Sequence, residues 1–209
     1  MNLDEALTRE PLVAILRGLT PARALEVASV LLDTGFTTVE VPLNSPDAVQ
    51  SIGLIRKEFT GRLVVGAGTV RTQEELNALS DVGCQIALSP HCDPDLIAHS
   101  LKLEIEPVPG VATPTEMMQA LNAGARWLKV FPAVSCGESF FRQVRAVFPS
   151  HVRLMAVGGV APENMRGFMQ AGADAIGIGS QLFTPDKSLA DIRDQAAKIV
   201  SKIRSHTTL

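Results

Sequence analysis

The sequence predicts an α/β fold, a single compact TIM (β/α)8 barrel in which eight strands are each followed by a helix. Three observations support this prediction. Short apolar runs with strand character alternate with longer segments of helical spacing along the whole chain. Signals for helix starts and glycines at helix ends separate these segments. The 209 residues leave about 26 for each unit, which suits a small barrel of this class.

The predicted strands are short and mostly apolar. In order they are Leu12–Leu16, Thr38–Val41, Leu63–Ala67, Gln85–Ser89, Glu104–Val108, Trp127–Phe131, Arg153–Val157 and Ala175–Gly179. A short N-terminal helix is expected before the first of them. Because no linker or low-complexity tract interrupts the alternation, we expect one domain over residues 1–209.

The predicted helices carry recognisable start and stop signals. A capping residue followed by proline marks four starts, at Thr20-Pro21, Ser45-Pro46, Asp93-Pro94 and Thr113-Pro114, and Thr72 with Glu75 has the pattern of a capping box. Glycine stands between a helix and the next strand at Gly35, Gly83, Gly124 and Gly172, where it enters a left-handed cap without steric cost. A doubly wound open sheet is the alternative fold, but its GxGxxG fingerprint is missing after the first strand.

The composition excludes several classes of protein. Apolar residues make up 46% and charged residues 20%, as in ordinary globular proteins. The net charge of -3 and the scattered Lys and Arg argue against a nucleic-acid partner. The N-terminal segment lacks the basic and apolar regions of a secretion signal, and no apolar run approaches the roughly 20 residues of a membrane span. We therefore expect a cytoplasmic protein with no membrane partner.

The cysteines and histidines do not indicate a metal site. Cys84, Cys92 and Cys136 form no CxxC pair, and an odd, sparse count fits reduced thiols. His91 and Cys92 are weak candidates for zinc ligands, because no second pair completes a set of four.

Lys129 is the most informative residue in the chain. It lies in the apolar run from Trp127 to Phe131, where a charged ammonium group is costly unless it pairs or loses its proton. A lysine that is neutral near pH 7 attacks carbonyl carbon and forms a Schiff base. The alternative is a structural lysine at a strand end whose head group reaches solvent.

Glu40 is the second candidate. Period-two alternation points it away from Val39 and Val41, so it faces the barrel interior if the valines face the helices. A buried carboxylate needs a partner, and Lys129 is the obvious one. The pair predicts either a structural ion pair or a general acid/base beside an imine-forming lysine. Burial lowers the pKa of a lysine and a nearby carboxylate raises it, so the sequence leaves the direction open.

Glycines follow the last two strands, where barrels of this class often bind phosphate. Gly158 and Gly159 precede helix signals, and Gly179 with Ser180 repeats the arrangement one unit later. Tight turns that need positive φ are the alternative reading. Arg17 and Thr69 end two other strands and suit a carboxylate. Together these residues predict a substrate with a carboxylate at one end and a phosphate at the other.

Several segments along nearly the whole chain are similar to one enzyme family. They are Ala14–Gly18, Val39–Leu43, Val65–Val70, Pro107 and Gly110 within Glu106–Gly110, Leu128–Ala133 and Gly158–Val160. Together they resemble the 2-keto-3-deoxy-6-phosphogluconate and -galactonate aldolases. The resemblance implies a class I aldolase on a compact barrel, assembled as a homotrimer. It makes Lys129 the Schiff-base lysine and Glu40 an acid/base that works with a water.

The resemblance also assigns the binding residues. Gly158, Gly159, Gly179 and Ser180 match the phosphate site, and Thr69 and Arg17 match residues near the pyruvate carboxylate. Two departures indicate the galactonate branch, because gluconate enzymes commonly carry arginine at the position of Asn44 and threonine at that of Val157. Val157 has no hydroxyl to bind the C4 hydroxyl, whose configuration distinguishes the two substrates. Without that arginine, Arg17 becomes the expected carboxylate clamp.

The leading hypothesis is cleavage of 2-dehydro-3-deoxy-6-phosphogalactonate to pyruvate and glyceraldehyde 3-phosphate. The imine nitrogen serves as the electron sink, so neither a metal nor an organic cofactor is required. One alternative has the C4 epimer, the gluconate compound, as the main substrate. Another is a phosphosugar-binding barrel without catalysis, against which the presence of both Lys129 and Glu40 argues. A metal-dependent epimerase is disfavoured, because histidines and aspartates are missing from the predicted strand ends.

Overall fold

A computed structural model describes residues 1–205 and confirms the predicted barrel. Its strands are all parallel and follow the order β5-β4-β3-β2-β1-β9-β8-β7-β6. They span Leu12–Ile15 (β1), Thr38–Pro42 (β2), Val64–Gly68 (β3), Ile86–Leu88 (β4), Glu106–Val108 (β5), Gly110–Val111 (β6), Trp127–Val130 (β7), Arg153–Val157 (β8) and Ala175–Ile178 (β9). The two ends of this order, β5 and β6, are separated by Pro109 alone, so one interrupted strand closes the ring.

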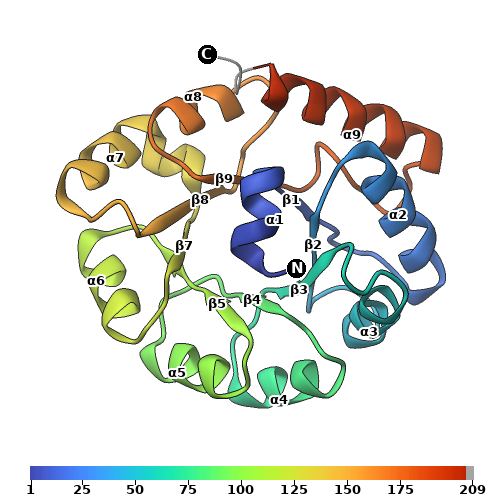
Figure 1. Cartoon of the computed structure of the whole chain (residues 1–209), viewed down its shortest axis with the longest axis horizontal. Helices are drawn as coiled ribbons and strands as arrows, with labels where there is room; N and C mark the ends of the chain where they lie inside the picture. The colour runs from blue at the N-terminus through green and yellow to red at the C-terminus, as the bar shows by residue number, and fades with distance from the viewer. Residues whose placement is uncertain (206–209) are drawn as a thin grey trace.

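Helices form an outer ring around the sheet (Figure 1). They span Pro21–Thr34 (α2), Ala48–Glu58 (α3), Gln73–Asp81 (α4), Pro94–Lys102 (α5), Pro114–Asn122 (α6), Ala133–Val147 (α7), Met165–Gln170 (α8) and Leu189–Arg204 (α9). The expected N-terminal helix is α1, Leu3–Arg9, which lies inside the ring in Figure 1. Its apolar residues Leu3, Ala6 and Leu7 pack with the inward side chains of the strands, so α1 closes the amino-terminal end of the barrel. No helix among residues 1–205 is long and apolar enough to cross a membrane.

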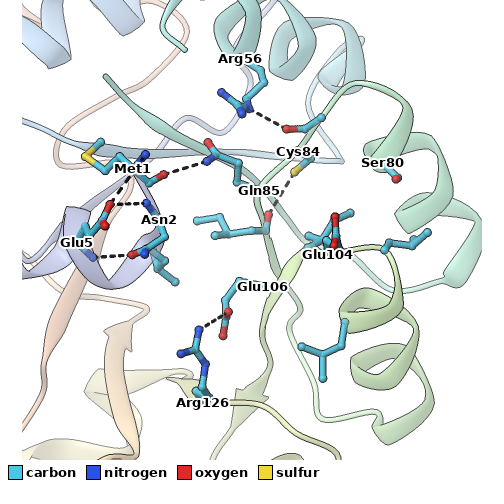
Figure 2. A pocket seen from close by; sticks show the side chains of 16 residues that line it. Met1, Asn2, Glu5, Arg56, Ser80, Cys84, Gln85, Glu104, Glu106 and Arg126 are labelled. Atoms are coloured by element: carbon cyan, nitrogen blue, oxygen red, sulfur yellow. Dashed lines mark hydrogen bonds and ion pairs between the residues drawn. The ribbon is translucent and has the colours of Figure 1, made fainter. Parts of the chain in front are cut away.

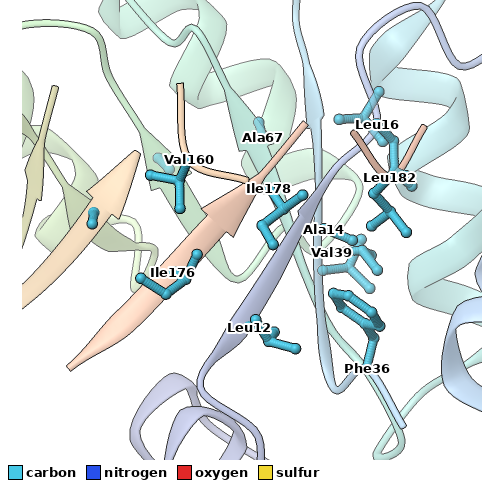
Figure 3. Close-up of a cluster of buried hydrophobic side chains, with 14 of the residues drawn as sticks. Leu12, Ala14, Leu16, Phe36, Val39, Ala67, Val160, Ile176, Ile178 and Leu182 are labelled. Carbon is cyan, nitrogen blue, oxygen red and sulfur yellow. The ribbon is translucent and has the colours of Figure 1, made fainter. Parts of the chain in front are cut away.

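Side chains alternate between two buried layers. One layer lies between strands and helices and includes Leu12, Ala14, Val39, Ile176 and Ile178, shown in Figure 3. The other fills the barrel and takes the intervening residues, such as Val13, Val64, Met155 and Val157. Because side chains on a strand alternate, each residue that lies between two outward-facing ones points into the barrel.

Most local signals act as predicted. The side chains of Thr72, Asp93 and Thr113 cap their helices, and Thr20 lies at the N-cap of α2 without a side-chain bond. The glycines Gly35, Gly83, Gly124 and Gly172 all have positive φ. The prediction at Ser45-Pro46 was wrong, because α3 begins at Ala48 after Asp47. The Ser45 hydroxyl instead accepts a hydrogen bond from the Gly18 N–H at 2.9 Å.

The fifth predicted strand differs in its bounds. Glu104 has a φ of 58° and precedes the strand, which starts two residues later at Glu106. Pro109 then interrupts it, because proline has no N–H to donate to a ladder. The Pro109 carbonyl still accepts the Lys129 N–H at 2.8 Å, which joins the closing strand to β7.

Candidate active site

Lys129 and Glu40 both point into the barrel. On β7, Leu128 and Val130 face the helices, and on β2, Val39 and Val41 do the same. The intervening Lys129 and Glu40 are therefore directed inward, and only 6% and 4% of their surfaces remain exposed. The expectation that Lys129 lies in an apolar interior is confirmed, and a solvent-facing head group is excluded.

Burial dominates the electrostatics of this pair. Burial raises the pKa of Glu40 to about 7, against the opposing influence of the Lys129 and Arg17 charges. Burial also lowers the pKa of Lys129 to about 8, with Glu40 opposing the shift and Arg17 adding to it. None of the ion pairs among the described residues joins the two head groups, so they interact through space. Both groups are thus poised to exchange protons near neutral pH.

Phe131 is a neighbour of Lys129 that is not among the predicted site residues. The Lys129 Nζ lies 5.0 Å from the centroid of the Phe131 ring, within the range of a cation–π contact. Phe131 follows Lys129 by two residues, and side chains two residues apart on a strand lie on the same face. Strand periodicity could therefore have predicted this contact from the sequence. The Gly158 backbone approaches the same ring, because a Cβ at Gly158 would lie 3.0 Å from it.

Arg17 follows β1 and is exposed at the carboxyl end of the barrel. Its Nη1 donates to the Asn44 Oδ1 at 2.5 Å. Asn44 follows β2, which pairs with β1 in the sheet. Adjacent strands therefore supply Arg17 and the Asn44 amide that orients it. In the sequence, Asn44 stands out only as a departure from the gluconate pattern, and its contact with Arg17 is seen only in the structure.

Thr69 follows β3 and is half-buried. Its φ of 60° lies in the left-handed region, which a β-branched residue rarely adopts. Such strain is found preferentially at functional positions. Val157, at the end of β8, is buried in the inner layer, and a Cβ at Gly177 on β9 would lie 2.8 Å from its Cγ2.

The loops after β8 and β9 only partly match the prediction. Gly158 and Gly159 have φ values of 98° and 75°, as a tight turn requires. The helix expected directly after them begins later, at Met165, because Asn164 accepts a bond from the Ala161 N–H and donates to the Gly159 carbonyl.

After β9 the chain makes a single turn. The Leu182 and Phe183 N–H groups bond the Gly179 carbonyl, and α9 begins only at Leu189. Within residues 1–205, the N–H groups of Gly159, Val160 and Ser180 donate to no acceptor. Free donors of this kind on adjacent strand ends are suited to an anion, although no helix begins directly after either of these strands as predicted.

The predicted site residues come from one continuous arc of the sheet. They lie in or shortly after the strands β3, β2, β1, β9, β8 and β7, which are consecutive neighbours in the sheet. Glu40 and Lys129 project inward from within β2 and β7, and the other predicted residues lie at the carboxyl ends of their strands. The structure therefore gathers toward one end of the barrel the predicted residues Thr69, Glu40, Arg17, Gly158, Gly159, Gly179, Ser180, Val157 and Lys129. Over residues 1–205, no group of three or more His, Cys, Asp or Glu residues could hold a metal ion.

A hollow of about 760 Å³ opens at the opposite, amino-terminal end of the barrel, beside the start of α1 (Figure 2). None of the predicted site residues lines it. Some of its polar groups bond one another, since the Gln85 Nε2 donates to the Met1 carbonyl and Arg126 pairs with Glu106 at 2.7 Å. Active sites of barrels of this class lie at the other, carboxyl-terminal end.

The fold and site define a parallel α/β barrel with a buried lysine and carboxylate at its carboxyl end. The chain belongs to the KDPG and KHG aldolase family, whose sequence model matches residues 3–199. It is 40% identical to the 2-dehydro-3-deoxy-6-phosphogalactonate aldolase of Escherichia coli (strain K12), over 94% of this chain and 96% of that enzyme.

Solved structures show the same similarity. A native KDPGal aldolase structure superposes with a TM-score of 0.93 at 40% identity, over 95% of this chain and 97% of that one. The KDPG aldolase of Legionella pneumophila, with pyruvate captured as a covalent carbinolamine intermediate, superposes with a TM-score of 0.82 at 26% identity, over 96% and 95% of the two chains.

Proposed function

We propose that this protein is a class I aldolase that cleaves 2-dehydro-3-deoxy-6-phospho-D-galactonate to pyruvate and D-glyceraldehyde 3-phosphate. The observation that carries the proposal is the inward-facing pair Lys129 and Glu40, both almost fully buried at the carboxyl end of the barrel. A relative of 26% identity holds pyruvate as a carbinolamine, which is the adduct that an amine forms with a ketone. The 40% identity to a galactonate enzyme supports the choice of substrate.

In the proposed mechanism, the neutral Lys129 amine attacks the C2 ketone and forms a carbinolamine. Loss of water gives a protonated imine, with Glu40 supplying the proton for the departing hydroxide. Because burial lowers the pKa of Lys129 to about 8, a useful fraction of the amine is unprotonated near neutral pH. Because burial raises the pKa of Glu40 to about 7, the same carboxyl both gives and takes protons there.

Glu40 then removes the proton of the C4 hydroxyl, and the C3–C4 bond breaks. The electron pair of that bond moves into the protonated imine and leaves an enamine on Lys129, while C4 becomes the aldehyde of glyceraldehyde 3-phosphate. Protonation of the enamine at C3 and hydrolysis of the imine release pyruvate and restore the amine. The lysine nitrogen accepts the electrons throughout, so the proposed cycle requires neither a metal nor an organic cofactor.

The ends of the substrate are assigned from charge and hydrogen-bond donors. Arg17, oriented by Asn44, offers a guanidinium to the carboxylate, and Thr69 adds a hydroxyl nearby. Gly158, Gly159, Gly179 and Ser180 form the proposed phosphate site at the ends of β8 and β9. The free N–H groups of Gly159 and Ser180 support that assignment.

Val157 is proposed to select between the C4 epimers. We expect the chain to release pyruvate from both epimers, with the higher kcat/KM for the galactonate compound. Val157→Thr keeps the side-chain shape and adds a hydroxyl, which should shift the ratio of kcat/KM toward the gluconate epimer by about tenfold. Measuring kcat/KM on both epimers, for the wild type and this variant, tests activity and selectivity together.

Val157→Ala is the matched control, because it removes apolar contact without adding a hydroxyl. It should lower kcat/KM for both epimers to a similar degree. A wild type that clearly prefers the gluconate epimer would overturn the choice of substrate. Saturable binding of the phosphate esters without release of pyruvate would favour the non-catalytic barrel instead.

The protein is further proposed to act in the cytoplasm as a homotrimer. Its three cysteines are free, as expected in a reducing compartment. The trimer rests on family resemblance and on apolar side chains exposed beside a hollow between α6 and α7, where Val147 is 77% and Met118 48% exposed.

Sedimentation equilibrium is expected to give about three times the 22.3 kDa mass of the chain. Val147→Asp should lower that mass if this surface is the contact, because it places a charge in an apolar interface. A wild type that sediments as a monomer at micromolar concentration contradicts the proposed assembly.

A further inference from the structure

We infer that Gly68 is a positioning residue for Glu40, and that the space left by its missing side chain seats the carboxylate of the catalytic pair. The inference rests on the proposed function of Glu40 and adds a residue that acts only through it. Gly68 ends β3 and faces into the barrel, because Val65 and Ala67 face the helices.

The distances around Gly68 define this seat. A Cβ at Gly68 would lie 2.0 Å from the Glu40 Oε2, 2.6 Å from Cδ and 2.7 Å from Oε1. The carboxylate therefore occupies the volume that any other residue at this position would fill. The Glu40 Oε2 is buried and accepts no hydrogen bond from the described residues, so among protein groups it is the space at Gly68 that accommodates that oxygen.

The conformation of Gly68 does not itself require glycine. Gly68 lies within β3, and its φ is outside the left-handed region that alanine avoids. Space is thus the reason for glycine here. The atoms that alanine would meet belong to the end of a flexible side chain, so Gly68→Ala should displace the Glu40 carboxylate and leave the barrel folded.

Gly66 provides a matched comparison on the same strand and the same face. A Cβ at Gly66 would lie 2.1 Å from the Ile86 Cγ1 and 2.8 Å from the Ile86 carbonyl oxygen, so alanine there collides with core packing and backbone. The three atoms nearest that Cβ all belong to Ile86, so Gly66→Ala should lower the melting temperature through core packing. The two variants separate a role in packing from a role in positioning.

The test compares kcat, its pH profile and the melting temperature for Gly68→Ala. We expect kcat to fall by about 10–100-fold, as for a catalytic group displaced by about 1 Å. The melting temperature should change less than in Gly66→Ala, and borohydride with pyruvate should still label Lys129. The acidic limb of the pH profile should move to lower pH, because a displaced carboxylate is better solvated and ionises more easily.

A double-mutant cycle with Glu40→Asp makes the test sharper. Aspartate withdraws the carboxylate by one methylene and leaves room for a methyl group, so Gly68→Ala should cause little further loss in that background. Equal fold-losses in both backgrounds, a normal kcat and pH profile, or a fall in melting temperature as large as that of Gly66→Ala would each overturn the role of Gly68. If the wild type itself releases no pyruvate from either epimer, it is the proposed function that fails.

Discussion

Replacing Lys129 with methionine is expected to lower aldol cleavage by about 10⁴-fold or more, because no other group supplies the amine that forms the imine. In the wild type, sodium borohydride with pyruvate should reduce the imine to a stable secondary amine on Lys129. Peptide mass spectrometry should find this adduct on that residue alone and find none in the variant. An adduct on another lysine, or none on the wild type, would reject Lys129 as the nucleophile.

The same variant is expected to be more stable than the wild type. The pKa of Lys129 is about 8 in the folded protein, below its ordinary value, so its protonated form disfavours folding. The free energy of unfolding is therefore highest above the pKa that Lys129 has in the unfolded chain, where the amine is neutral in both states. This stability is lost as the pH falls through about 8. Methionine has a similar length and no charge, so the free energy of unfolding should rise at pH 7.

Lys198→Met is a matched control, because Lys198 is exposed on α9. It should leave both kcat and the free energy of unfolding unchanged. Loss of activity in Lys129→Met together with a loss of stability would indicate a structural lysine instead of a nucleophile.

Replacing Glu40 with glutamine is expected to lower kcat by about 10²–10⁴-fold, the usual contribution of a general acid/base. The wild-type kcat/KM should be highest between about pH 7 and pH 8, because the proposed cycle begins with one proton on the pair, so that Lys129 attacks as the neutral amine and Glu40 supplies the proton for dehydration. The variant should instead show a single rise with pH, which reflects loss of the Lys129 proton. That rise should lie below about pH 8, because the Glu40 charge no longer raises the pKa of the lysine.

Glu40→Gln should also change how stability depends on pH. The pKa of Glu40 is raised to about 7, so the wild type loses stability as the pH rises from about 4.5 through about 7. Glutamine does not ionise, and its advantage should grow over that range to about 1–3 kcal/mol. Urea unfolding of both proteins at several pH values measures this difference.

The exposed Glu26→Gln on α2 is the control and should show no such trend. A pH profile that is identical in Glu40→Gln and the wild type would remove Glu40 from the proposed mechanism.

The positions of the strands could be predicted because each one is a short apolar run, and the burial of Glu40 and Lys129 followed from simple alternation. What the sequence could not decide depends on distant contacts. Ser45 has the local pattern of a helix cap, yet its hydroxyl bonds the Gly18 N–H, 27 residues away. The helix expected directly after Gly159 is delayed because Asn164 bonds the loop.

The direction of the two pKa shifts also lay beyond the sequence. Burial and the partner charge act in opposite senses on each group, and only the three-dimensional structure shows that burial prevails. The seat at Gly68 was hidden for a related reason. The predicted strand ends at Ala67, whereas in the structure β3 extends to Gly68, whose missing side chain makes room for a residue of another strand.

The closure of the sheet by the strand interrupted at Pro109 limits how copies of this protein can associate. Since β4 borders the first half of the interrupted strand and β7 the second, the sheet of the described residues has no open margin for a foreign strand to extend. Self-association must then proceed through helix surfaces and loops. Growth into fibrils by strand addition would first require the ring to break.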